Sequence, residues 1–133
     1  MPTRRNIITL AAVAVTVPIA GFAQATEAYF KDFTSDAFKA AQKAGKPILI
    51  DVWASWCPTC KAQGPILKSL LADPKNKDMV MFRVNFDTQL DVLKTFNVQQ
   101  QSTLIVFKGA TEAGRSVGDT NKSSIAALLA SAI

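Results

Sequence analysis

A short apolar segment that leads into two closely spaced cysteines constrains the fold of this chain more than any other feature. Residues 47–53, Pro-Ile-Leu-Ile-Asp-Val-Trp, are rich in apolar and β-branched side chains, which is typical of a buried strand. The motif Cys57-Pro58-Thr59-Cys60 follows, and a helix is predicted from about residue 58 to residue 71. The sequence therefore places the two cysteines on a strand-to-helix turn.

Strand-like and helix-like segments alternate through the rest of the chain. Further helices are predicted over residues 34–44, 88–96 and 123–133, and further strands over residues 79–86, 103–107 and 112–117. Pro65 lies inside the helix after the cysteines and should kink it. No repeat and no second apolar span occurs after the N-terminal segment. Residues 26–133 are therefore predicted to form one α/β domain, with an antiparallel pair of strands near its end.

Residues 1–25 have the features of an export signal. Arg4 and Arg5 precede an apolar run over residues 7–20, which is shorter than the roughly twenty residues of a membrane span. Small residues lie at both positions that a signal peptidase reads, so cleavage is expected after Ala25. The arginine pair also resembles a twin-arginine signal, with a general secretory signal or an uncleaved anchor as alternatives. We expect the domain to lie in an oxidising compartment, the bacterial periplasm.

Composition excludes several kinds of function. The chain has two cysteines and no histidine, which excludes Ser-His and Cys-His hydrolases and histidine-ligated zinc or haem sites. Two cysteines do not complete a four-cysteine metal site within one chain. The net charge of +5 is mild and no Lys/Arg run is present, so no nucleic-acid partner is expected. The two cysteines could therefore act in redox chemistry or form one structural disulfide.

The position of the cysteines favours redox chemistry. The free N–H groups and the macrodipole at a helix N-terminus stabilise an anion, which lowers the pKa of Cys57 and makes it the nucleophile. Cys60 lies one turn further and can attack the resulting mixed disulfide, which releases the reduced substrate. A structural disulfide that closes so small a loop would add little stability.

The segment from Asp51 to Lys61 resembles the active site of the thioredoxin family. Pro65 falls where thioredoxins have their helix-kinking proline, Asp51 where they have a buried aspartate, and Gly118 at the glycine of the last strand. Arg83 replaces a lysine near that aspartate. The resemblance covers about residues 30–132 and implies a thioredoxin fold, with a central mixed sheet flanked by helices. Residues 44–47 also resemble the C-terminal periplasmic domain of DsbD-type reductases.

The resemblance also implies roles for individual residues. Asp51 would be the proton acceptor for Cys60, because burial raises the pKa of a carboxyl group, and Arg83 would tune that pKa. No cofactor is implied beyond the redox-active disulfide between Cys57 and Cys60. Five residues are expected to contact substrate: Trp56, Pro58, Thr59, Gln101 and Ser102. Of these, Pro58 and Thr59 replace the usual Gly-Pro pair, through which the family tunes its reduction potential.

The segment Gln101-Ser102-Thr103 departs from the family pattern, because thioredoxins have a cis-proline at the position of Ser102. A cis bond before a non-proline residue costs about 3 kcal/mol, which favours a trans bond here. The change allows a more polar substrate groove, a hydrogen bond from Ser102 to the Cys57 thiolate, or simple drift at this position. It also allows metal access, with four thiolates from two chains holding a metal or an iron–sulfur cluster.

The expected function is reduction of protein disulfides by a monomeric enzyme that acts on protein thiols and disulfides. Reduction is favoured over oxidation because the strong oxidant DsbA has a histidine between its cysteines, and this chain has none. A reductant in an oxidising compartment needs electrons, which implies a membrane donor of the DsbD type. The alternatives are a disulfide oxidase or isomerase, a metal or iron–sulfur binding module, and a thiol-dependent interaction protein.

Overall fold

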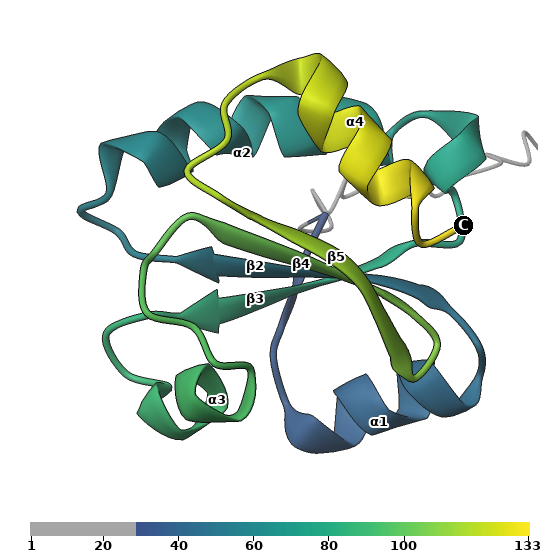
Figure 1. Cartoon of the computed structure of the whole chain (residues 1–133), viewed down its shortest axis with the longest axis horizontal. Helices are drawn as coiled ribbons and strands as arrows, with labels where there is room; N and C mark the ends of the chain where they lie inside the picture. The colour runs from purple at the N-terminus through teal and green to yellow at the C-terminus, as the bar shows by residue number, and fades with distance from the viewer. Residues whose placement is uncertain (1–28) are drawn as a thin grey trace, which may run out of the picture.

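A five-stranded mixed sheet forms the centre of the structure, a computed structural model that describes residues 29–133 (Figure 1). The strands lie in the order β1-β3-β2-β4-β5. The parallel strands are β1 (Lys31–Asp32), β3 (Val80–Asn85) and β2 (Pro47–Trp53). Strand β4 (Thr103–Lys108) is antiparallel to both β2 and β5 (Thr111–Val117). The predicted export signal lies outside the described residues.

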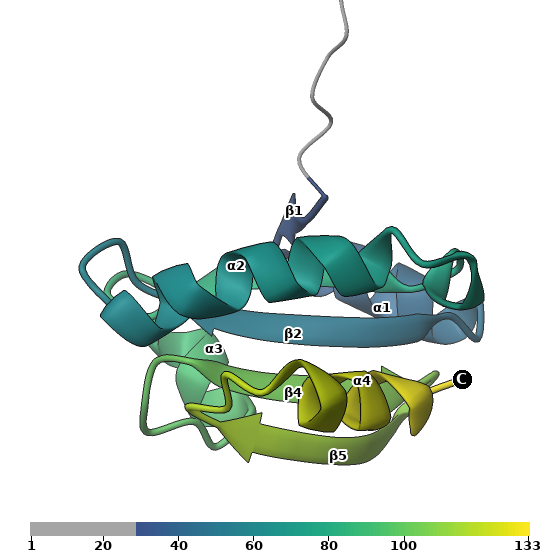
Figure 2. The same ribbon diagram turned by 90° about the horizontal axis from the view of Figure 1, so that it is seen from above.

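Helices cover both faces of this sheet. Helices α1 (Ser35–Lys43) and α3 (Leu90–Thr95) lie on one face, and α2 (Pro58–Leu71) and α4 (Lys122–Ala130) lie on the other (Figure 1). Seen from above, α2 runs along β2 while α4 lies over β4 and β5 (Figure 2). The predicted α/β class, a mixed sheet flanked by helices, is confirmed. No helix within residues 29–133 is long and apolar enough to cross a membrane.

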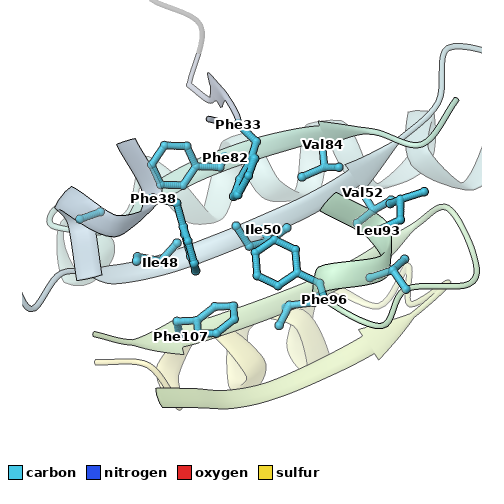
Figure 3. Close-up of a cluster of buried hydrophobic side chains, with 13 residues drawn as sticks. Phe33, Phe38, Ile48, Ile50, Val52, Phe82, Val84, Leu93, Phe96 and Phe107 are labelled. Carbon is cyan, nitrogen blue, oxygen red and sulfur yellow. The ribbon is translucent and has the colours of Figure 1, made fainter. Parts of the chain in front are cut away.

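The alternation of side chains along β2 divides the core into two parts. Ile48, Ile50 and Val52 point toward α1 and α3, where five phenylalanines pack mostly edge to face (Figure 3). Leu49 points to the opposite face and packs with residues of α2 and α4. Asp51 follows Leu49 by two positions, so it lies on the face that α2 covers.

Most predicted element bounds agree with the structure because local signals fix them. The Thr34 hydroxyl caps α1 by accepting a hydrogen bond from the N–H of Ala37, and Gly45 stops that helix with a φ of +68°. Helix α2 continues through Pro65. Helix α3 is shorter than predicted, and Leu90 at its start is exposed. Strand β1 and the short 3-10 helix over Pro74–Asn76 were not predicted.

Candidate active site

Cys57 is the N-cap residue of α2. Its backbone is extended, and its sulfur accepts a hydrogen bond from the N–H of Cys60 at 3.1 Å. Pro58 occupies the first helical position, where its missing N–H costs nothing. An N-cap side chain usually supplies an oxygen to the free N–H groups of the first turn. Here a sulfur takes that place, so the positive end of the helix faces the predicted nucleophile.

The hydroxyl of Ser102 joins the two cysteines. Its Oγ lies 3.1 Å from the Sγ of Cys57 and 3.1 Å from the Sγ of Cys60. Both cysteines are free thiols, and Cys57 is 1% exposed and Cys60 3% exposed. The Ser102 hydroxyl can donate to the Cys57 sulfur, and the single S–H of Cys60 can be donated either to that hydroxyl or directly to the Cys57 sulfur. The sequence left this bond to Cys57 as one of several possibilities.

Hydrogen bonds separate the acidities of the two thiols. Burial raises the pKa of the Cys57 thiol. Hydrogen bonds from the side chains of Cys60 and Ser102 and from the N–H groups of Cys60 and Thr59 lower this pKa by more than burial raises it, so the pKa lies below its ordinary value. Burial and the hydrogen bond to Cys57 raise the pKa of the Cys60 thiol. The geometry therefore favours a thiolate at Cys57 and a thiol at Cys60, the order that their predicted roles require.

Asp51 and Arg83 form a largely buried ion pair beside this turn. They are register partners on β2 and β3, and the Nε and Nη2 of Arg83 donate to Oδ2 of Asp51 at 3.2 and 3.1 Å. The guanidinium lies over the rings of Phe30 and Trp53, at 3.9 and 4.9 Å from their centroids. Burial raises the pKa of Asp51 above 3.8, although the charge and hydrogen bonds of Arg83 oppose the shift.

The predicted substrate-contacting residues differ in their exposure. Trp56 is 55% exposed, and its indole Nε1 donates to both carboxylate oxygens of Asp87, at 3.2 and 2.9 Å. This bond holds the ring at the surface beside Cys57. Pro58 is exposed, Thr59 and Gln101 are half-buried, and Ser102 is buried. Ser102 therefore contacts the sulfurs from inside the protein rather than from the surface.

Ser102 has an unusual backbone conformation. Residues 29–133 contain no cis peptide bond, so the bond before Ser102 is trans, and its φ is +62°. Its N–H donates to the carbonyl of Val52 at 2.8 Å, and its carbonyl accepts from the N–H of Gly118 at 3.0 Å. A left-handed φ is uncommon outside glycine and has an energetic cost. Both backbone groups of this residue are thus used within the protein rather than offered to a substrate strand.

Two residues that shape this site, Asp87 and Gln63, were not predicted from the sequence. Gln63 is 1% exposed, and its Nε2 donates to the carbonyls of Ser102 and Asp119 at 3.3 and 2.8 Å. A signal for Gln63 existed, because it is a polar residue at an inward helical position in line with Cys60 and Leu67. Nothing in the local sequence indicates the bond between Asp87 and Trp56, which joins positions 31 residues apart.

The described residues offer little to a metal ion. Within residues 29–133 no group of three or more histidine, cysteine, aspartate or glutamate side chains could hold one. Cys57 and Cys60 supply two thiolates, so a cluster on these residues would need a second chain.

Comparisons with known proteins agree with this geometry. The family profile described as Thioredoxin matches residues 29–131. A thioredoxin of Echinococcus granulosus is 35% identical over 92 residues, which cover 69% of this chain and 84% of that protein. The crystal structure of Trxlp from Edwardsiella tarda has a TM-score of 0.72 and 45% identity, and covers 74% of this chain and 95% of that one. A bifunctional thioredoxin reductase/thioredoxin of Mycobacterium leprae is 30% identical over 62% of this chain, which spans only 18% of that protein.

Proposed function

The chain belongs to the thioredoxin family, and from that premise we propose that it is an exported reductant of protein disulfides with Cys57 as its nucleophile. As a member of the family it is a thiol–disulfide oxidoreductase that acts on protein thiols and disulfides. The observation that carries the proposal is the position of the Cys57 sulfur. It caps α2, accepts the N–H of Cys60, and lies against the Ser102 hydroxyl.

The reaction consists of two exchanges. The Cys57 thiolate attacks one sulfur of the substrate disulfide, which forms a bond between Cys57 and the substrate and releases the other substrate sulfur as a thiolate that takes up a proton. Cys60 then loses its proton and attacks the Cys57 sulfur, which releases the second substrate thiol. Two electrons pass to the substrate, and the Cys57–Cys60 disulfide is the oxidised product.

Asp51 is the proposed acceptor of the Cys60 proton. It lies on the sheet face that α2 covers, and burial raises its pKa toward the range in which a carboxylate takes up a proton near neutral pH. Arg83 opposes this rise, and unlike lysine it stays charged at every relevant pH. The ion pair would set how strong a base Asp51 is.

Electron supply and location complete the proposal. The signal features of residues 1–25 support export to a bacterial periplasm. A reductant there must be reduced again, and a membrane donor of the DsbD type would supply the electrons. The absence of histidine between the cysteines supports reduction rather than oxidation, and we expect the protein to act as a monomer.

An insulin-reduction assay with Cys57→Ser and Cys60→Ser variants tests the chemistry. Loss of activity in Cys57→Ser and capture of mixed-disulfide partners by Cys60→Ser are expected. Full activity in Cys57→Ser would overturn the assignment of the nucleophile. Equilibration with glutathione tests the direction, since a reduction potential near or above about −150 mV would indicate an oxidase or isomerase. N-terminal sequencing of protein recovered from the periplasm tests cleavage after Ala25.

A further inference from the structure

Gln63 is a buried polar residue that the exchange chemistry does not require. It lies one turn after Cys60 on the inward face of α2, a face that otherwise carries apolar side chains such as Leu67 and Leu70. Burial of a carboxamide is unfavourable unless hydrogen bonds replace its bonds to water. A methionine or leucine would fill such a helix position without that cost.

Two carbonyl groups fix the orientation of the Gln63 carboxamide. The carbonyl oxygens of Ser102 and Asp119 only accept hydrogen bonds, so the amide nitrogen must face them. The opposite atom, Oε1, is buried and has no hydrogen-bond partner within residues 29–133. The two hydrogen bonds that the amide nitrogen donates therefore come with the cost of a buried oxygen that has no partner.

Three hydrogen bonds to the Ser102 backbone hold this residue in its left-handed conformation, and its carbonyl accepts two of them. The N–H of Ser102 is held by Val52, and its carbonyl is held by the N–H of Gly118 and by Gln63. Backbone orientation decides where a side chain as short as serine points. At φ +62° the Ser102 Oγ lies between the two sulfurs, so the contacts that maintain this φ also place the hydroxyl.

We propose that Gln63 is a positioning residue, which holds the Ser102 hydroxyl between Cys57 and Cys60 and thereby stabilises the Cys57 thiolate. The proposal rests on the proposed function, in which that thiolate is the nucleophile. The segment at Ser102 lacks the proline that the family has there. In this protein Gln63, which belongs to α2, would fix that segment through its hydrogen bond to the Ser102 carbonyl.

The test measures the rate at which iodoacetamide alkylates Cys57 across a pH series, in purified protein. Gln63→Met and Ser102→Ala are each expected to lower this rate at pH values below the titration midpoint, by about tenfold for loss of one hydrogen bond to a thiolate. The double variant is expected to be no slower than Ser102→Ala, because both changes remove the same contact. Leu70→Ala, a buried change on the same helix, is the control: it lowers stability and leaves the midpoint unchanged.

Two results would overturn the proposal. One is an unchanged alkylation midpoint in Gln63→Met; the other is a double variant whose loss equals the product of the two single losses. If Gln63→Met does not fold, the proposal is tested instead by nuclear magnetic resonance of the unmodified protein. The Gln63 carboxamide protons should exchange slowly and shift when the dithiol is oxidised, and rapid exchange would contradict the proposal. Activity retained in Cys57→Ser would instead refute the proposed function, so the two failures are distinguishable.

Discussion

Ser102→Pro, which introduces the residue that thioredoxins have at this position, is expected to destabilise the reduced protein. Proline fixes φ near −65°, whereas Ser102 has a φ of +62°. Proline also lacks the N–H that donates to the Val52 carbonyl at 2.8 Å. The family residue is therefore incompatible with the trans, left-handed backbone of this chain.

The expected loss of stability is the cost of three lost hydrogen bonds, reduced by the release of backbone strain at position 102. Loss of the bond to the buried Val52 carbonyl costs about 2 kcal/mol, because the only side-chain donor within residues 29–133 that this oxygen then keeps is the weak Cys60 thiol at 4.0 Å. Rotation of φ moves the carbonyl at position 102 away from Gly118 and Gln63, at about 1 kcal/mol for each bond. Escape from the left-handed region returns about 1–2 kcal/mol. The net loss is about 2–3 kcal/mol, a large part of the stability of a small domain.

Urea unfolding of the reduced protein, followed by circular dichroism, measures this loss. Ser102→Gly is the matched control, since glycine accepts a positive φ and keeps the N–H, and its stability should lie within about 1 kcal/mol of the unmodified protein. Both variants lack the hydroxyl, so the difference between them reports the backbone alone. A Ser102→Pro variant as stable as Ser102→Gly would refute the reasoning.

Three further predictions concern the ionisable groups and the exposed ring. The alkylation rate of Cys57 should titrate with a midpoint below that of free cysteine under the same conditions, because hydrogen bonds lower the pKa of its thiol, and a midpoint at or above that of free cysteine would contradict this. The raised pKa of Asp51 means that the folded protein binds its proton more tightly than the unfolded chain. The unmodified protein should therefore lose stability as the pH rises from 3.8 through that raised pKa, and Asp51→Asn should lack this slope in urea unfolding across the same pH range. Equal slopes would show that the carboxyl group is not the cause. Trp56→Ala should change the free energy of unfolding by less than about 1 kcal/mol, because the ring is 55% exposed. The same variant should lower kcat/KM for insulin about tenfold, whereas its activity on a small aromatic disulfide should be almost unchanged.

The sequence predicted the elements whose signals are local. Residues 47–53 are mostly apolar and lie between turn residues, and Pro58 suits the first turn of a helix, so β2 and α2 agree with their predicted bounds. Strand β1 has two residues and exists through its pairing with β3, which no local pattern indicates. The resemblance placed Arg83 near Asp51, and the structure adds the aromatic rings that enclose its guanidinium.

The contacts that organise the candidate site were harder to predict because they depend on tertiary structure. Ser102 meets Cys60 across 42 residues of sequence, through the start of β4 lying beside the start of α2. A buried glutamine is unfavourable in a helix considered alone, and it becomes intelligible only with the two carbonyls that it contacts. The positive φ of Ser102 follows from those same contacts, and serine itself does not indicate it.

The depth of the two sulfurs bears on how long the protein stays reduced. Cys57 is 1% exposed and Cys60 3%, so each sulfur offers little surface to a small oxidant in solution. Restricted access then slows the loss of electrons to such oxidants, in addition to the effect that the acidity of Cys57 has on the rate. A protein partner that reshapes the surface around Cys57 as it docks would be slowed less. Kinetic access, rather than thermodynamic driving force, would then decide which oxidants take electrons from the dithiol.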